Sequence, residues 1–496
     1  MTINLVNRHS NRQINLDRLN GREIIANFDG GSITSDAGIV LLSELDKKLE
    51  ITSRFAKCFQ DHRNPSYVHY SIDRLLAQRI YAIALGYEDV NDHDKLRNDP
   101  ALEIALDRIN RIKPNSETIA GKSTINRLEY CPEEILDQSK SRYHKIEHQP
   151  KKIEKVFVDI FLNSYDQQPK QIILDLDVTN DTVHGNQSGA FFNAYYDEVC
   201  YAPLYIFCGH HLLVSKLRSS NVDPADGALE ELQRVIRLIK EKWKETQIIV
   251  RGDSAYAREE IMNFCEQEEN VQYILAMATN TRLKSRAFDT IEKAKRDYEQ
   301  RLEPVTKLME TLFTKEDDLE KVGKLVPVST WFRSINYQTE KSWSCQRRVV
   351  TKVCYGSEGL TIHHVVTSLP ASKISPSLLH THKYCPRGEM ENRLKEQQLD
   401  LFADRTSTQT FESNQLRLWL SSMAYVLMQA FRKNCLSQTP LAKSTVGTIR
   451  LNLLKIGARI TISTRRVVIA IASMYQFKDI LIIAYARIEM IPHPEI

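Results

Sequence analysis

The sequence predicts an α/β protein in which helices cover a mixed β-sheet and helical regions flank it at both ends. Five short runs rich in Ile, Val, Leu and Tyr lie between residues 171 and 279, a composition typical of strands. Amphipathic helical patterns separate the last three runs, and strand–helix–strand units build sheets with helices packed against them. No period of 20 to 50 residues recurs, which argues against a solenoid.

The N-terminal region, residues 1–165, has mainly helical patterns. Ser71–Leu85 carries apolar residues at helical spacing and ends before Gly86, a residue type that commonly terminates helices. Further helices are expected at 101–111, 123–130 and 151–163.

The expected sheet falls in residues 166–299, the first part of the predicted core. Its helices are expected at 227–244 and 257–268, between the last three strands. The strands are expected at 171–179, 201–209, 211–219, 247–254 and 272–279.

Strand-like patterns return between residues 300 and 375, for example QRRVVTKVCY and LTIHHVVTS. We interpret this stretch as a β-rich insertion into the core. The second part of the core, residues 376–435, contains helical patterns at 388–400 and 411–431. Residues 436–496 form a separate C-terminal region in this interpretation.

The composition is that of a folded protein of the cytoplasm. Hydrophobic residues make up 42% of the chain, which excludes a largely disordered protein. No stretch approaches the roughly 20 apolar residues of a membrane helix, and the polar first residues lack a signal core. The nine cysteines are scattered singly and are expected to be reduced.

The net charge of +4 decides little, but its distribution is informative. Between Ser413 and Lys478 there is no Asp or Glu, whereas there are ten Lys or Arg residues, including Arg465 and Arg466. Such a one-sign field attracts polyanions. The pattern favours a nucleic-acid partner, although a basic surface on an ordinary helical domain also explains it.

Asp175 and Asp177 lie in the apolar run IILDLDVT. Side chains alternate faces along a strand, so the two carboxylates face one side and the leucines between and before them face the other. Buried carboxylates on one face need a cation or hydrogen-bond donors. A divalent metal is the simplest compensation, and the alternative is an exposed face with two solvated acids.

Asp253 follows the apolar run QIIVRG and precedes a helical pattern. Carboxylates at the C-terminal ends of strands are common catalytic groups in α/β folds. Taken alone, Asp253 is better explained as the N-cap of the following helix.

Glu391 lies near the start of a predicted helix that follows Pro386 and Gly388. Lys395 and Gln398 share its face, at i+4 and i+7. By itself, a solvated Glu–Lys pair is the simpler explanation of this glutamate.

These three acids lie in the blocks LDLDVTNDTVHGNQSGAFFNAYY, IIVRGDSAYA and YCPRGEMENRLKE. Two further blocks, FDGGSITSDAGIVLLSELD and GYEDVNDHDKLRNDP, precede them. Together and in this order, the blocks resemble DDE-type insertion-sequence transposases with an RNase H-like core, the transposase DDE domain of group 1. Tyr384, Arg387 and Glu391 match the signature Y-x2-R-x3-E-x6-K, whose lysine position holds Gln398.

The resemblance implies a DNA transposase with Asp177, Asp253 and Glu391 as its catalytic acids. These acids, with Asp175 beside them, would bind two Mg²⁺ or Mn²⁺ ions. Hydrolysis at the transposon ends would precede attack of the freed 3′-hydroxyl on target DNA. The partners implied are terminal inverted repeats, target DNA and a second copy of the chain on paired ends, with no membrane. The enzyme would be cytoplasmic and nucleoid-associated when bound to DNA.

The resemblance also implies a set of DNA contacts. Tyr384, Arg387 and Lys395 or Gln398 would hold phosphates, the N-terminal helical region would bind DNA, and an aromatic residue of the insertion would stack on a flipped base. The other candidates are Trp331 and Trp343 for stacking, and Arg282, Lys284, Arg286, Arg465 and Arg466 for the backbone.

Two other functions stay open from the sequence alone. The first is a nuclease with the same core that cuts DNA without joining it. The second is a non-catalytic DNA-binding protein descended from a transposase, which the intact trio of acids argues against.

Overall fold

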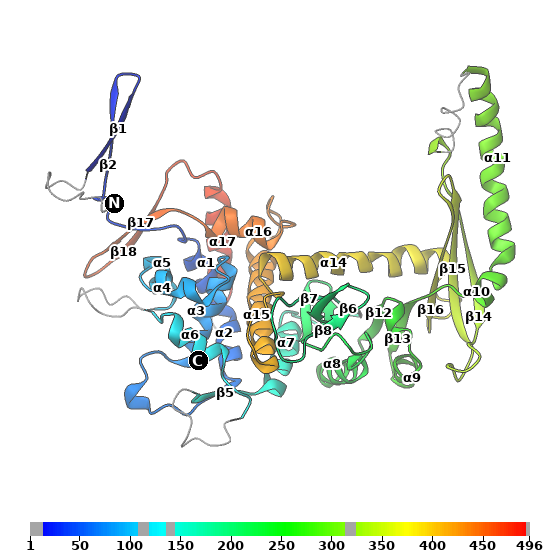
Figure 1. Ribbon diagram of the computed structural model, residues 1–496, viewed down its shortest axis with the longest axis horizontal. Helices are drawn as coiled ribbons and strands as arrows, with labels where there is room; N and C mark the ends of the chain where they lie inside the picture. Colours follow the sequence, from blue (N-terminus) through cyan, green and yellow to red (C-terminus); the bar gives the residue numbers. More distant parts are fainter. Residues whose placement is uncertain (1–12, 108–118, 135–143, 313–323, 493–496) are drawn as a thin grey trace. The chain divides into compact units, whose positions relative to one another are not determined.

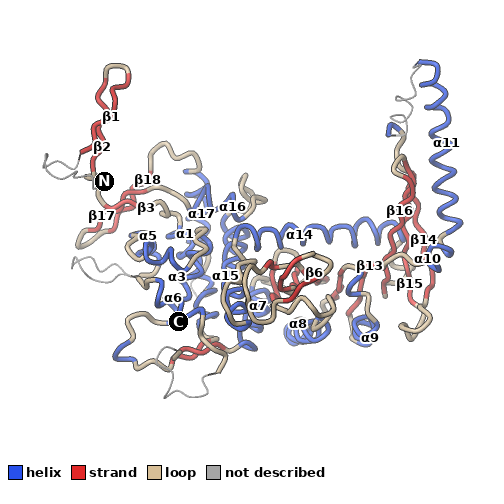
Figure 2. The backbone as a smooth tube through the Cα atoms, in the orientation of Figure 1, coloured by secondary structure: helices blue, strands red, loops and turns tan. Residues whose placement is uncertain are grey.

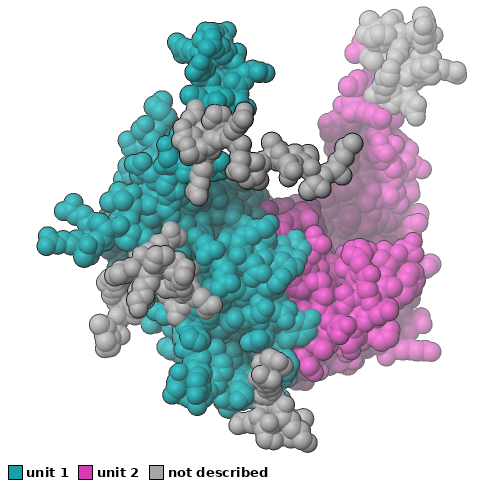
Figure 3. Space-filling view, turned by 60° about the vertical axis from the view of Figure 1, so that its left-hand side comes forward, with its two compact units in different colours: residues 1–148, 423–496 teal, residues 149–422 magenta. Residues whose placement is uncertain are grey.

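The computed structural model describes residues 13–107, 119–134, 144–312 and 324–492. The chain divides into two compact units, drawn in different colours in Figure 3. Residues 1–148 and 423–496 form the first unit, and residues 149–422 form the second. The three candidate acids all belong to the second unit.

An eight-stranded mixed sheet forms the centre of the second unit (Figures 1 and 2). Its order is β11-β10-β6-β12-β13-β16-β15-β14, with β6, β12 and β13 parallel and β10, β11 antiparallel to their neighbours. The predicted α/β class is confirmed, and the five consecutive strands β11-β10-β6-β12-β13 form the expected RNase H-like core. The strands are β6 (Gln171–Val178), β10 (Leu204–Cys208), β11 (His211–Lys216), β12 (Gln247–Gly252), β13 (Val271–Met277), β14 (Ser329–Tyr337), β15 (Arg347–Gly356) and β16 (Gly359–Thr367).

Alternation along β6 gives the sheet two different faces. Ile172, Leu174 and Leu176 enter the larger core beneath α7 (Pro150–Asn163), α8 (Ala228–Lys242) and α9 (Glu259–Gln267). Each such buried side chain contributes about 1.5–3 kcal/mol. Asp175 and Asp177 therefore point to the opposite face.

A helical segment, residues 376–400, crosses that opposite face. Its buried Leu379 packs in a smaller core with Ile249 and Ile274 of the sheet. Two turns of π-helix interrupt it, and such turns often occur at functional sites. The segment consists of α13 (Pro376–Leu378), η4 (Leu379–Tyr384), η5 (Cys385–Arg387), α14 (Gly388–Lys395) and η6 (Glu396–Asp400).

The stretch expected to be a β-rich insertion is part of the central sheet. After α10 (Thr281–Arg286) and the long α11 (Phe288–Leu312), the chain forms β14, β15 and β16. Strand β16 pairs antiparallel with β13, with Ile274 opposite Thr367. This pairing satisfies the backbone groups that β13 would otherwise expose as an edge strand. The segment 313–323 lies outside the described residues.

The first unit joins the two ends of the chain. The backbone N–H groups of Ala37 and Gly38 donate to the carbonyls of Ile456 and Leu454, at 3.0 and 3.2 Å. A Cβ at Gly38 would meet the Leu453 carbonyl oxygen at 1.8 Å, so only glycine fits there. The N- and C-terminal regions, expected to be separate, thus fold together.

The boundary between the units also differs from the expected residue 165. Helix α7 buries Ile153, Phe157 and Phe161, and Phe161 belongs to the core of the central sheet. The boundary therefore falls after residue 148. Part of the helix expected at 101–111 lies outside the described residues.

The first unit is built mainly from short helices. It also contains the sheet β18-β17-β3, the pair β4–β5 and an exposed hairpin, β1–β2. Helix α15 (Phe411–Cys435) begins in the second unit and ends in the first. The other elements are β1 (Gln13–Leu19), β2 (Arg22–Asn27), β3 (Ser32–Thr34), α1 (Ile39–Leu49), α2 (Ile51–Ala56), β4 (Phe59–Asp61), α3 (Ile72–Ala84), α4 (His93–Leu96), α5 (Pro100–Ala105), α6 (Lys122–Glu129), β5 (Ile146–His148), α16 (Val446–Ile449), β17 (Ala458–Ile462), β18 (Val467–Ile471) and α17 (Lys478–Met490).

The cysteines and the helices agree with what the composition indicates. All nine cysteines are free thiols. Within the described ranges, no helix has both the length and the apolar character needed to cross a membrane.

Candidate active site

Two parallel strands bring the first two acids to one edge of the sheet. Asp177 is the next-to-last residue of β6, and Asp253 directly follows β12. The strands are hydrogen-bonded neighbours in which Arg251 lies opposite Asp175. Because parallel strands end at the same edge, Asp177 and Asp253 meet there. Asp253 also caps the short turn after β12, since its Oδ1 accepts from the Ala255 N–H at 2.9 Å, so the expected capping role and the site position coexist.

The third acid reaches the same place from the crossing helix. Arg387 and Glu391 lie one turn apart on this helix, and the Arg387 guanidinium contacts all three carboxylates. Its Nη2 is 2.9 Å from Asp177 Oδ2 and 3.9 Å from Asp253 Oδ2, and its Nη1 is 4.0 Å from Glu391 Oε1. The structure thus brings together the three acids that the sequence singled out.

Burial differs sharply among the members of this group. The side chains of Asp177 and Arg387 are 12% and 13% exposed, whereas that of Glu391 is 57% exposed. Burial raises the pKa of Asp177 to about 6, and the charges of Asp253 and Glu391 add to the rise, while Arg387 opposes it. The deepest acid is therefore the one that most needs a cation.

Asp175 differs from its expected role as a metal ligand. Its carboxylate accepts two hydrogen bonds from Arg251, at 2.5 and 2.7 Å, and both side chains are buried. The same guanidinium donates to the Lys383 carbonyl of the crossing helix. Asp175 therefore forms a buried ion pair that ties the helix to the sheet, and the compensating group that the sequence suggested is an arginine instead of a metal.

Gln398, at the usual lysine position, also forms hydrogen bonds within the chain. Its Nε2 donates to Thr179 Oγ1, the Asn180 carbonyl and Asp181 Oδ1, at 3.1, 3.0 and 3.2 Å. The π-helical turn that begins at Glu396 changes the helical phase, so Gln398 faces the loop after β6 while Lys395 stays exposed. Lys395 is thus the better placed of the two for a phosphate.

The donor set at the site suits a hard divalent cation. Three carboxylates surround one positive group, and carboxylate oxygen is the ligand that Mg²⁺ and Mn²⁺ prefer. In the described part of the chain, no three His, Cys, Asp or Glu side chains already lie at metal-ligand spacing. The exposed Glu391 and the partly exposed Asp253 have room to turn toward Asp177. The three carboxylates therefore fit a divalent cation once the Arg387 guanidinium moves out of the site.

The two tryptophans expected to stack on a base differ in exposure. Trp343 is only 6% exposed and packs edge-on against Tyr337, with Arg347 5.4 Å above its ring. This packing makes Trp343 a core residue of the sheet extension. Trp331 on β14 is 40% exposed and stays available.

The basic candidates lie on both units. In the second unit, Arg282 pairs with Glu340 at 3.3 Å and Arg286 donates to the Asn336 carbonyl, so both are partly engaged by the sheet extension. Lys284 between them is exposed. In the first unit, Arg465 and Arg466 are exposed at the turn between β17 and β18.

The sequence did not predict an aromatic hairpin that lies beside the acids. Phe191, Phe192 and Tyr195 are 46%, 59% and 88% exposed. Phe191 and Phe192 lie on β8 of a small sheet of order β7-β9-β8, and Tyr195 lies in the turn between β8 and β9. The strand β7 of this sheet starts just after β6. The dense aromatic run FFNAYY could have indicated it, because a contiguous exposed apolar patch commonly marks a binding site. The strands are β7 (Asp181–Thr182), β8 (Phe191–Asn193) and β9 (Glu198–Tyr201).

The hairpin is held firmly near the site. Asn193 Nδ2 donates to the Ser220 carbonyl at 2.7 Å, and Thr182 Oγ1 donates to Glu198 at 2.9 Å. Burial raises the pKa of Tyr196 to about 12, and the neighbouring Tyr195 and the negative charges of Asp177 and Asp253 contribute. Tyr196, which follows Tyr195 in the hairpin turn, is therefore within electrostatic reach of the acids.

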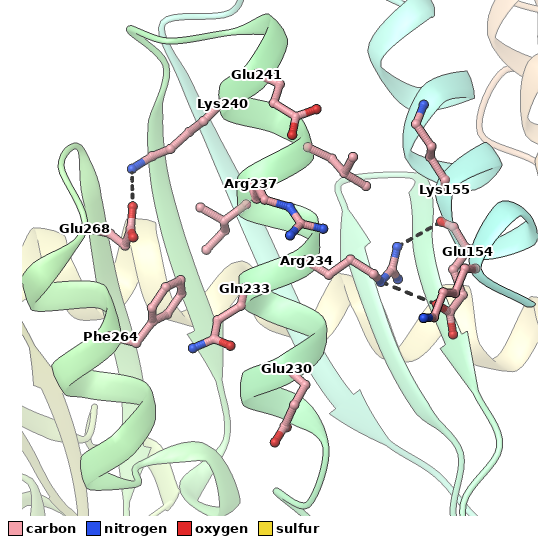
Figure 4. A pocket seen from close by; sticks show the side chains of 13 residues that line it. Glu154, Lys155, Glu230, Gln233, Arg234, Arg237, Lys240, Glu241, Phe264 and Glu268 are labelled. Carbon is pink, nitrogen blue, oxygen red and sulfur yellow. Dashed lines mark hydrogen bonds and ion pairs between the residues drawn. The ribbon is translucent and has the colours of Figure 1, made fainter.

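A surface groove of about 960 Å³ lies on the other side of the sheet, along α8 (Figure 4). Arg234 and Lys240 on its wall are paired with Glu231 and Glu268, at 2.6 and 2.8 Å. The groove contains none of the three acids. We regard it as a solvated, salt-bridged helix surface.

No curated protein matches the chain. Among solved structures, a piggyBac transposase synaptic complex with hairpin DNA is similar, with 10% identity and a TM-score of 0.40 over 85% of this chain and 80% of that one. The model of the family described as "Transposase DDE domain group 1" matches residues 16–493. The chain therefore belongs to the DDE transposases of group 1.

Proposed function

We propose that this transposase cuts DNA at transposon ends and joins the freed 3′-hydroxyl to target DNA, with Asp177, Asp253 and Glu391 as its catalytic acids. The observation that carries the proposal is the gathering of these carboxylates around Arg387, at 2.9 to 4.0 Å. Three acids from two strands and a helix concentrate negative charge where a phosphodiester must approach. Such a cluster repels a phosphodiester unless cations bind to it.

In this proposal the three acids hold two Mg²⁺ or Mn²⁺ ions. Members of the family generally use divalent metals. When bound, such ions lower the pKa of the attacking water or 3′-hydroxyl and neutralise charge on the leaving oxygen. Tyr384 and Lys395 flank the acids on the crossing helix and would orient the scissile phosphate, Lys395 through a charge-assisted contact. Helix packing on the sheet keeps Asp177 shielded from bulk water.

The joining step separates a transposase from a nuclease with the same core. We expect the purified chain, incubated with Mg²⁺, the DNA ends of its own element and a plasmid, to give both nicked ends and joined products. Cutting without joined products would favour the nuclease. DNA binding without cutting would favour a non-catalytic derivative. A second copy of the chain on paired ends, expected from the resemblance, would appear as a dimer on the DNA.

We further propose that the aromatic hairpin stacks on an unpaired base next to the scissile phosphate. Neighbouring strands lie about 4.8 Å apart, so β8 is only two strand spacings from the segment that follows Asp177. Tyr195 and Phe192 are exposed there on a backbone fixed by hydrogen bonds. Aromatic side chains in such positions bind bases of any sequence through their ring faces.

Tyr195→Ala should weaken binding to a duplex that carries 2-aminopurine in a short unpaired segment by about five- to tenfold. Fluorescence quenching of the 2-aminopurine measures the binding, and Tyr195→Phe should retain it. An equal loss on fully paired DNA would rule out stacking.

A further inference from the structure

Arg387 occupies the place where the three acids would meet a cation. It is the group common to all three contacts, and its side chain is 13% exposed. Its Nε is buried and has no hydrogen-bond partner. A guanidinium usually finds partners for its donors when buried. This one is positioned by the charge of the carboxylates more than by a complete hydrogen-bond network.

Arg251, on β12, offers an instructive comparison. Both of its terminal nitrogens and its Nε are used, by Asp175 and the Lys383 carbonyl. Arg251 is thus fixed in place, whereas Arg387 has one short contact, to Asp177, and two at 3.9 and 4.0 Å. Of these two arginines beside the acids, Arg387 has the weaker set of contacts and is the more readily displaced.

We propose that Arg387 is the internal counter-ion of the metal-free active site and that divalent cations displace it when they bind. This inference rests on the proposed function, in which the acids hold the cations. The released guanidinium keeps its place on the same helix turn as Glu391, where it can reach a phosphate oxygen. Cation binding thereby makes the Arg387 guanidinium available to a phosphate of the DNA.

The coupling has a definite sign. In the metal-free chain, Arg387 offsets the repulsion among Asp177, Asp253 and Glu391 and so stabilises the fold. In the loaded chain, the cations do this instead, and a positive charge left among the carboxylates would oppose them. Removing the charge of Arg387 must therefore destabilise the metal-free chain and strengthen cation binding.

The test measures Mn²⁺ binding by calorimetry on the full chain without DNA. Arg387→Gln should bind Mn²⁺ about tenfold more tightly than the native chain, which corresponds to about 1.4 kcal/mol. Arg387→Lys keeps the charge with a shorter reach and should fall between the two. Arg393→Gln, six positions along the same helix segment, removes an arginine paired with Glu396 and should leave the affinity unchanged.

Thermal unfolding supplies a second readout that a purely structural role would not produce. Arg387→Gln should melt below the native chain in EDTA and recover that difference in saturating Mn²⁺, since a ligand that binds the folded state stabilises it. Unchanged or weaker Mn²⁺ binding, or an equal loss of melting temperature with and without Mn²⁺, would overturn the inference. Absence of Mn²⁺ binding by the native chain would instead refute the proposed function.

Discussion

Asp177→Asn, Asp253→Asn and Glu391→Gln should each lower the rate of DNA cleavage by on the order of a thousandfold. Each substitution removes a carboxylate oxygen from the centre while it keeps the size of the side chain. The affinity for DNA should hold or rise slightly, because each variant removes negative charge from beside the phosphates. Cleavage of labelled transposon-end DNA and a binding titration on the same DNA separate the two effects.

Glu389 provides the matched control for this series. It lies on the same helix, two residues before Glu391, and is exposed. Glu389→Gln removes the same charge from nearly the same place and should leave cleavage close to that of the native chain. Near-native cleavage by any one of the three acid variants would remove that residue from the catalytic centre.

Breaking the Asp175–Arg251 pair should destabilise the fold by about 3–5 kcal/mol, because the remaining partner is a buried charge without a counter-ion. Both residues are 5% exposed. Arg251→Gln also removes the hydrogen bond to the Lys383 carbonyl, which loosens the helix that carries Glu391. Chemical denaturation of Arg251→Gln and Asp175→Asn measures the loss.

A double variant distinguishes an ion pair from a metal ligand at Asp175. Asp175→Leu combined with Arg251→Met replaces the pair by apolar side chains and should recover most of the lost stability. Mn²⁺ should still bind to this double variant, with an affinity no lower than that of Arg251→Gln, which lacks the same hydrogen bond to the Lys383 carbonyl. If Asp175→Asn instead leaves stability unchanged and abolishes Mn²⁺ binding, Asp175 is the metal ligand that the sequence alone suggested.

Local patterns predicted the strands and the positions of the acids well. Alternation in IILDLDVT separates Asp175 and Asp177 from the core leucines, and this depends only on strand geometry. The position of Asp253 after a buried strand also follows from local sequence. The convergence of these residues with Glu391 could be predicted only from the family resemblance, because the sequence of neither β6 nor β12 indicates that the two strands pair.

The features that the sequence did not predict depend on tertiary partners. Asp175 finds its counter-charge on Arg251, 76 positions away, and only the register between the two strands brings them together. Gln398 does not lie on the expected helix face. The prediction assumed a regular α-helix, whereas the π-helical turns shift the positions of the side chains around the helix axis. The association of Gly38 with Leu454 likewise joins the two ends of the chain, which no local pattern can indicate.

Anomalous diffraction from a crystal of the chain soaked in Mn²⁺, measured at the manganese absorption edge, locates the bound cations. We expect peaks at the carboxylates of Asp177, Asp253 and Glu391, with the Arg387 guanidinium moved away from Asp177. Peaks at other residues, or an unchanged Arg387 contact with no peak beside these acids, would refute the proposed metal centre.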